Sequence, residues 1–251
     1  MLDEIRDIVT ALRLLQAGDV GVTAYVERDT RVPPHSSGHP HMGVPAVLWS
    51  DFRVRRHGVV YNLDEDKIPA ACQLTEALQQ LHERPHRGGL EVALSRFNQS
   101  YGRDFPDDRI IDLTIALESC LLAAIRSQTE LKYRLALRGA ALLAKTRKPQ
   151  ETNSLLSALY NARSSIVHEG RYLFEQKSTS LVGLKPAEFL QTCEDVVRDI
   201  LREYVQVLVK AGAQSSISTV NQKLDQRILS GLSDPDERQR ESSSSEDRDL
   251  A

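Results

Sequence analysis

The stretch from Asp107 to Arg126 constrains the fold most, because its apolar residues leave almost no polar face on a helix. These residues are Ile110, Ile111, Leu113, Ile115, Leu117, Leu121, Leu122 and Ile125. A helix that is apolar all round has to be covered on every side. We therefore expect a central core helix with other helices packed around it.

Three further helical patterns follow along the chain, over residues 130–145, 149–168 and 186–208. The last two open on proline, which suits the first position of a helix. Gly170 suits the residue that follows a helix end. Together with the core helix, these patterns predict an antiparallel four-helix bundle over residues 101–212.

The first 100 residues have a different pattern. Apolar residues at helical spacing indicate helices, and alternating β-branched residues indicate strands. The expected helices cover residues 3–16, 69–82 and 90–99, and the expected strands cover residues 20–26, 47–54 and 59–63. The predicted fold class is therefore mainly α, with a smaller mixed α/β accessory region over residues 1–100.

The C-terminal end of the chain is polar. We expect a short extra helix over residues 213–230 and a disordered acidic, serine-rich tail over residues 231–251. The whole chain has 32 Lys and Arg against 35 Asp and Glu, a formal net charge of −3. This balance excludes a protein that is basic over its whole surface, although a local basic patch is compatible with it.

Cysteine content and hydropathy indicate the compartment. The three cysteines, Cys72, Cys120 and Cys193, are odd in number and far apart, which favours buried thiols in a reducing environment. No run approaches 18 apolar residues, and the acidic, amphipathic start of the chain does not read as a signal peptide. We expect a cytoplasmic protein with no membrane partner.

The most distinctive local motif is Arg163, four residues, then His168, within Tyr160–Gly170. It follows the segments 112–118 and 130–143 in order. With these three segments, residues 90–212 resemble the HEPN superfamily, and most closely its Apea-like branch. The resemblance implies a helical bundle that carries this motif on its third helix.

The resemblance also implies an activity. HEPN proteins are often metal-independent endoribonucleases that act as toxins or in antiviral defence. They work as homodimers, in which the Arg–His motifs of two protomers meet in a cleft. On this basis we expect RNA as the substrate and no cofactor, metal or DNA. Prokaryotic defence or stress response is the expected setting, with a regulatory protein partner as a further expectation.

The residue types suit this chemistry. Imidazole exchanges protons near neutral pH, so His168 is assigned to proton transfer, with products that carry 2′,3′-cyclic phosphate ends. A guanidinium offers a planar fork to phosphate oxygens, so Arg163 is assigned to phosphate binding. Residues five apart on an ideal α-helix lie about 140° apart around its axis, so the two converge only if the helix ends near Val167.

Supporting roles are assigned to Tyr160, Asn161 and Ser164, which lie beside the pair in sequence, and to Glu118, because the matching position in the HEPN family tends to be acidic. Ser164 departs from the family, in which Asn, Asp or His often follows the arginine. The alternative is a non-catalytic HEPN-like dimerisation, interaction or nucleotide-sensing module, because a histidine in the last turn of a helix also interacts favourably with the helix dipole.

Glu118 lies within the apolar core helix, where an unpaired carboxylate is costly. It either faces a polar cleft or forms an ion pair with Arg134 or Arg138 of the next helix. We favour the ion pair.

Residues 126–148 are the one marked concentration of basic side chains. They supply the candidate RNA-binding residues Arg134, Arg138, Lys145, Arg147 and Lys148. A solvated helix face explains them equally well. Tyr133 is the one aromatic residue among them, so base stacking is not indicated there.

His35, His39 and His41 have a spacing that resembles a zinc site. A fourth ligand is not evident, and proline and glycine crowd the segment, so we expect a surface loop without metal.

Overall fold

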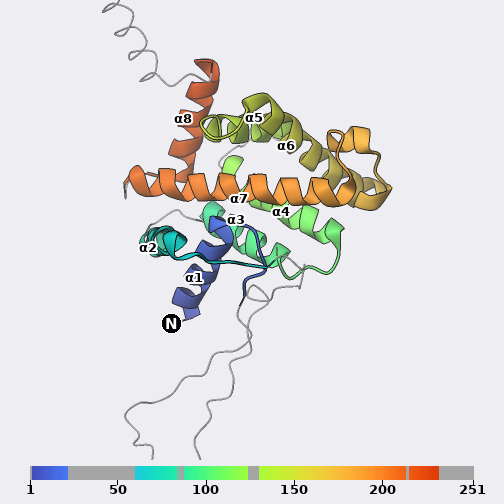
Figure 1. Cartoon of the computed structure of the whole chain (residues 1–251). Coiled ribbons are helices and arrows are strands. Elements are labelled where there is room, and N and C mark those ends of the chain that lie inside the picture. The colour runs from blue at the N-terminus through green and yellow to red at the C-terminus, as the bar shows by residue number, and fades with distance from the viewer. Residues whose placement is uncertain are drawn as a thin grey trace, which may run out of the picture.

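The computed structural model describes residues 2–21, 60–82, 84, 88–123, 130–212 and 215–231. Helices are the regular structure throughout these ranges, which contain no strand (Figure 1). The α-helices are α1 (Leu2–Leu15), α2 (Ile68–His82), α3 (Gly88–Ser100), α4 (Pro106–Leu121), α5 (Leu131–Leu142), α6 (Pro149–Ser164), α7 (Pro186–Lys210) and α8 (Ile217–Leu229). The short helical turns are η2 (Glu65–Lys67), η3 (Ser165–Glu169), η4 (Leu173–Glu175) and η5 (Ser178–Leu181). The predicted mainly α fold class is confirmed.

The prediction of a mixed α/β N-terminal region is not supported. Its three helices are present as α1, α2 and α3, but residues 60–63 are irregular where a strand was expected. Val60 is 77% exposed, and the Tyr61 hydroxyl donates to the carbonyl of Leu12, 2.7 Å away. This segment therefore packs on α1 instead of pairing with another strand. The expected strands at 20–26 and 47–54 lie almost wholly outside the described residues.

Helix α4 occupies the centre of the molecule, as its apolar sequence predicts. The side chains of Ile110, Leu113 and Leu117 are completely buried. The helix contacts α3 along one side and α5, α6 and α7 on the others. Its first turn also anchors a distant segment, because the Asp107 carboxylate accepts a hydrogen bond from the backbone N–H of Leu173 at 2.6 Å.

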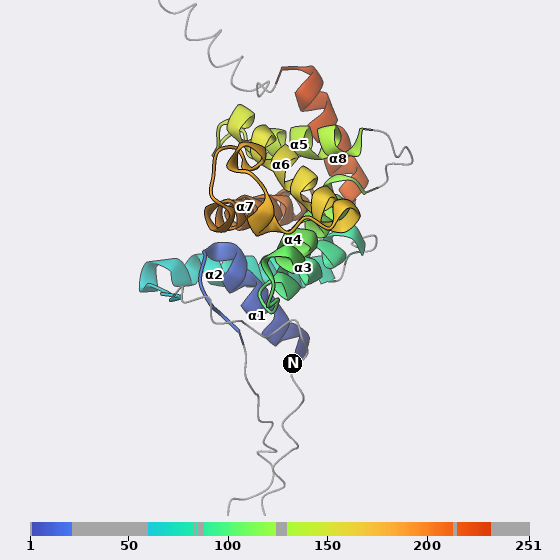
Figure 2. The ribbon, with the colours of Figure 1, turned by 90° about the vertical axis from the view of Figure 1, so that its right-hand side faces the viewer.

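Helix α7 joins the two halves of the fold. It runs between α1–α3 on one side and α5, α6 and α8 on the other (Figures 1 and 2). One hydrophobic core includes side chains from all eight α-helices. The boundary proposed at residue 100 stays a prediction, but α1–α3 share this core with the remaining helices. None of the described helices has the length and apolarity needed to cross a membrane.

Arginine side chains tie helix ends to distant parts of the chain. Arg84 donates to the carbonyls of Leu208 and Gly212 at the end of α7, at 2.6 and 3.0 Å. Arg202 of α7 donates to the carbonyls of Leu14 and Leu15 at the end of α1, both at 3.3 Å. The last carbonyls of a helix have no partner inside it, so these contacts satisfy them and fix how the helices are arranged.

Candidate functional site

The end of helix α6 is built as a wide turn. The α-helix stops at Ser164, and Ser165–Glu169 continue as one turn of π-helix. The carbonyl of Ser165 accepts hydrogen bonds from the backbone N–H groups of both Gly170 and Arg171. Gly170 has φ of 65°, a left-handed conformation that glycine adopts without steric cost. The glycine therefore ends the helix, as the sequence predicts.

This wide turn changes the geometry of the Arg–His motif. A π-helix is closed by hydrogen bonds between residues five apart, so each turn holds more residues than an α-turn. Arg163 lies in the last α-turn, and His168 lies in the π-turn. Compared with a continued α-helix, the wide turn rotates His168 back toward the face that carries Arg163. Such single π-turns occur frequently at functional sites.

Arg163 is half-buried, and one of its donors has no protein partner. Its Nε is buried and makes no hydrogen bond. A buried donor that lacks a partner is costly, and the cost is larger for a charged group. Arg163 is thus the member of the motif that a bound acceptor could satisfy.

Glu118 of α4 is the acidic neighbour of Arg163. Burial raises the pKa of the Glu118 carboxyl, and the positive charge of Arg163 opposes this rise. The two groups interact through space, and neither makes a direct ion pair within the described parts of the chain. Two of the predicted site residues, far apart in sequence, therefore lie together where α4 packs against α6.

The expected ion pair between Glu118 and Arg134 or Arg138 is wrong. Arg138 forms two hydrogen bonds of 2.7 Å with the carboxylate of Asp225 in α8, and its side chain is 5% exposed. The Arg138 guanidinium holds the pKa of Asp225 below its ordinary value. Asp225, and not Glu118, is therefore the partner of Arg138. The basic residue that interacts with Glu118 is Arg163.

The other predicted motif residues lie at the surface of this helix end. His168 and Asn161 are exposed, and Tyr160 and Ser164 are half-buried. Tyr160 packs against the hydrophobic core and holds this part of α6 in place. His168 is therefore open to a substrate, whereas Arg163 is partly enclosed.

Three of the five predicted RNA-binding residues, Arg138, Arg147 and Lys148, are held in ion pairs with acidic side chains. Arg138 is buried in its pair with Asp225 and does not present its guanidinium to RNA. Arg147 pairs with Asp199 at 2.6 Å, and Lys148 pairs with Glu151 at 2.8 Å. Lys145 is exposed and Arg134 is half-buried. Arg147 and Lys148 precede the first turn of α6, about 22 Å from Arg163 along a helix of 1.5 Å rise per residue.

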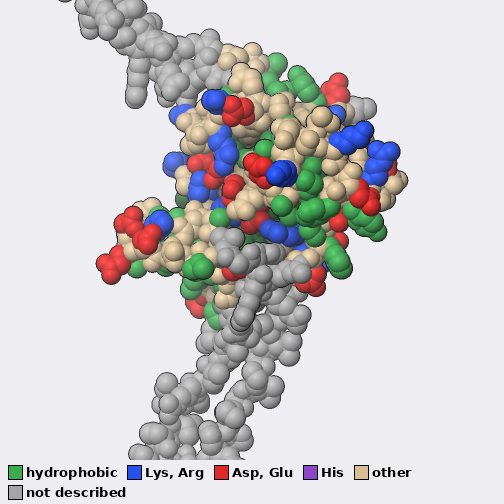
Figure 3. Space-filling view, turned by 45° about the vertical axis from the view of Figure 1, so that its right-hand side comes forward, with side chains coloured by type: hydrophobic (Ala, Val, Ile, Leu, Met, Phe, Trp, Pro, Cys, Tyr) green, Lys and Arg blue, Asp and Glu red, His purple; other side chains and the backbone are tan. Residues whose placement is uncertain are grey.

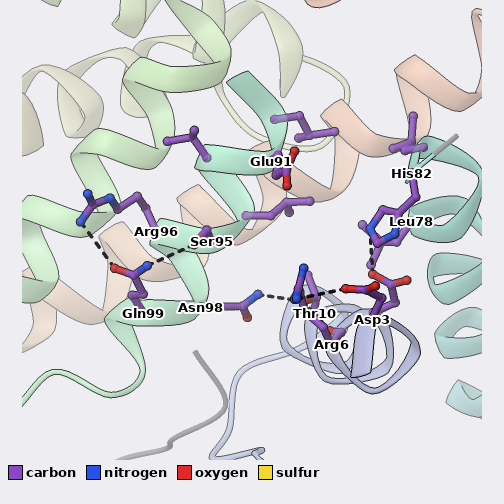
Figure 4. A pocket seen from close by; sticks show the side chains of 15 residues that line it. Asp3, Arg6, Thr10, Leu78, His82, Glu91, Ser95, Arg96, Asn98 and Gln99 are labelled. Atoms are coloured by element: carbon purple, nitrogen blue, oxygen red, sulfur yellow. Dashed lines mark hydrogen bonds and ion pairs between the residues drawn. The ribbon is translucent and has the colours of Figure 1, made fainter. Parts of the chain in front are cut away.

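Two cavities of the described residues stand out, and neither of these two is lined by Arg163 or His168. The first, of about 530 Å³, lies between α1, α2 and α3, with Thr10, His82 and Asn98 among its lining residues (Figure 4). His82 pairs with the buried Asp7 at 3.2 Å, and the Asn98 amide donates to Thr10 at 2.8 Å. The second cavity, of about 660 Å³, lies at the start of α6.

Sequence reasoning missed three exposed aromatic residues near this pair: Phe105, Tyr172 and Phe174. Base stacking was not expected for residues 126–148, and these three aromatic residues lie outside that segment. The signal was present in Tyr172-Leu173-Phe174, where a buried leucine separates two aromatic residues that point outward.

Metal and thiol chemistry have little support in the described residues. These residues contain no cluster of three or more His, Cys, Asp or Glu side chains that could hold a metal. His35, His39 and His41 lie outside the described ranges. Burial raises the pKa of Cys120 to about 12 and that of Cys193 well above its ordinary value. Cys72 is exposed, which corrects the expectation that it is a packing residue.

Comparison with known proteins adds no relative. No protein-family model matches the chain, and no curated protein or solved structure matches it. The resemblance to the HEPN superfamily therefore stays a prediction.

Proposed function

We propose that this chain is a metal-independent endoribonuclease of the HEPN type, with Arg163 and His168 as its catalytic residues. In this proposal α4, α5, α6 and α7 form the four-helix bundle, and two protomers join their motifs across a dimer cleft. The observation that carries the proposal is the helix end itself. A buried arginine donor without a partner lies one π-turn before an exposed histidine.

Arg163 binds the scissile phosphate. A phosphate oxygen can accept the hydrogen bond that the protein leaves open at Nε, and the guanidinium stabilises the charge that develops on phosphorus-bound oxygens in the transition state. Glu118 positions this guanidinium through its opposite charge. Glu118 is assigned this positioning role because it is half-buried and interacts with Arg163, whereas His168 is exposed.

His168 moves the protons. The 2′-oxygen loses its proton and attacks the phosphorus, the bond from phosphorus to the 5′-oxygen breaks, and the 5′-oxygen gains a proton. The products carry a 2′,3′-cyclic phosphate and a 5′-hydroxyl. One imidazole cannot hold both positions at once, so the second histidine comes from the partner protomer.

The test is RNA cleavage in the presence of EDTA by the full chain and by two variants, His168→Ala and Arg163→Ala. Loss of a general acid or base lowers rates by about 100- to 10,000-fold, so we expect a loss of that size for His168→Ala. His82→Gln is the matched control, since His82 lies among α1–α3 and should leave cleavage unchanged. Equal cleavage by the wild type and His168→Ala contradicts the proposal.

A second outcome identifies the alternative. A stable dimer that leaves RNA intact over a range of substrates overturns the nuclease proposal and supports a non-catalytic interaction module. Ser164, at a position where catalytic HEPN members often carry Asn, Asp or His, is the feature that favours this alternative.

A further inference from the structure

Three aromatic side chains are exposed on the side of the molecule that carries the end of α6. Phe105 is 68% exposed, Tyr172 is 61% exposed and Phe174 is 62% exposed. Figure 3 shows hydrophobic side chains reaching the surface beside Lys and Arg side chains on the side formed by the α6–α7 connection. Large rings exposed together are unusual on a protein surface and indicate a contact site. We call these three residues the aromatic patch.

The backbone holds the aromatic patch in a fixed place. Leu173, between Tyr172 and Phe174, is completely buried, and its N–H donates to Asp107 at 2.6 Å. Asp107 lies two residues after Phe105, so this hydrogen bond brings the two parts of the patch to one place. The backbone N–H of Tyr172 also donates to the Glu175 carboxylate at 3.2 Å. The rings are therefore presented by an anchored turn, which lowers the entropy cost of binding.

Tyr172 of the aromatic patch lies close to His168 along the chain. Only four residues lead from His168 to Tyr172, a span of at most about 14 Å even when fully extended. Arg171, between them, is exposed and pairs with Glu169 at 3.4 Å. Lys177, also exposed, follows three residues after Phe174. Rings and cations at this distance from a scissile phosphate can contact the adjacent nucleotides of the same strand.

Rings interleaved with cations are typical of surfaces that bind single-stranded nucleic acid. The rings stack on base faces, and the cations follow the phosphates. A duplex hides the faces of its bases in the stack, so such a surface selects unpaired RNA. All three residues are aromatic. Stacking on bases requires aromatic rings, whereas a general hydrophobic contact would not.

We propose that Phe105, Tyr172 and Phe174 stack the bases of single-stranded RNA next to the phosphate held by Arg163. The inference rests on the proposed function and adds a substrate preference to it. The aromatic patch determines specificity, while Arg163 and His168 perform the cleavage.

The test measures RNA binding by fluorescence anisotropy with the full chain carrying His168→Ala, so that the probe stays intact. The probes are a labelled oligouridylate and an abasic oligoribonucleotide with the same number of phosphates. We expect a preference for the base-bearing probe of at least about fivefold, the effect of one stacked base. Adding Tyr172→Ala and Phe174→Ala should remove the preference and leave binding of the abasic probe unchanged.

Two further variants make the test specific. Tyr133→Ala is the matched control, because Tyr133 is 60% exposed but lies on α5, and it should keep the preference. Tyr172→Leu with Phe174→Leu keeps apolar side chains and removes the rings, and it should lose the preference. If these leucines retain it, the contact is not stacking and the inference is wrong.

The outcomes separate this inference from the proposed function. If the wild type fails to cleave RNA but the base preference and its loss are observed, the nuclease proposal fails and the aromatic patch stands. If RNA is cleaved but the patch variants bind both probes as before, the inference alone fails. A change of mass in solution without a change in base preference identifies the patch as a contact between copies and overturns it.

Discussion

At the scale of single residues, Glu118 is a carboxyl group that the fold does not stabilise. The sequence correctly predicts that a carboxylate in this helix is costly, but it assigns the wrong arginine. Arg138, which was expected to pair with Glu118, pairs with Asp225, and Asp225 lies 87 residues away in sequence. No local pattern could reveal this pairing. A charged group that costs stability beside a candidate site is typical of functional residues.

Glu118→Gln should therefore stabilise the fold at pH 7, by less than about 1 kcal/mol because the side chain is only partly buried. The folded pKa lies above the ordinary value of 4.5, so the folded state holds the proton more tightly. The contribution of Glu118 to wild-type stability therefore falls as pH rises through 4.5 to the folded pKa, and the gain from glutamine should vanish below pH 4. Urea unfolding at pH 7 and pH 3.5 measures this.

The same substitution should slow RNA cleavage, because the neutral amide positions Arg163 less strongly. Glu151→Gln is the matched control, since Glu151 is exposed and pairs with Lys148. A Glu118→Gln protein that is less stable than the wild type at pH 7 contradicts the electrostatic assignment.

At the scale of elements, the sequence predicts the helices well and their ends less well. Proline at the first position placed the starts of α6 and α7 correctly, and Gly170 marked the end of the π-turn η3 that continues α6. The π-turn could not be predicted, because it depends on which backbone donors reach one carbonyl. The strand expected at 59–63 failed for a related reason, since alternation in sequence does not supply a neighbouring strand.

Gly170 offers a test of the wide turn. Its positive φ is costly for alanine, by about 1 kcal/mol, and tolerable for asparagine. A Cβ here would meet no atom within 4 Å, so any effect arises from the backbone alone. We expect Gly170→Ala to lower stability by that amount and to slow RNA cleavage severalfold, while Gly170→Asn stays close to the wild type. Urea unfolding and cleavage rates in EDTA measure both. Wild-type cleavage by Gly170→Ala would show that the turn does not position His168.

At the scale of the whole molecule, one hydrophobic core joins all the described helices. The mainly α class and the central place of α4 followed from apolar periodicity, which reports burial directly. The arrangement of α1–α3 against α7 did not follow, because it depends on arginine contacts between residues more than 100 positions apart. The candidate site, too, was only partly predictable from the sequence. Arg163 and His168 were proposed from their spacing together with the resemblance of three segments to the HEPN superfamily, whereas the exposure of Tyr172 and Phe174 became evident only in the fold.

The burial of each cysteine predicts the reactivity of its thiol. Cys120 and Cys193 are buried in α4 and α7, and burial raises the pKa of both, so they stay protonated and inaccessible. Cys72 is exposed on α2. We expect one reactive thiol per native chain, none in Cys72→Ser and three in denaturant, by titration with a chromogenic disulfide. Three fast-reacting thiols in the native protein contradict the closed core.

In the proposed function, Arg163 and His168 cleave RNA through the 2′-hydroxyl of the RNA itself. The most direct measurement is the chemistry of the ends that the wild type produces from a mixed RNA in EDTA, beside His168→Ala. We expect 2′,3′-cyclic phosphate and 5′-hydroxyl ends from the wild type and intact RNA from the variant. Ends with 3′-hydroxyl and 5′-phosphate, or equal cleavage by the variant, would contradict it.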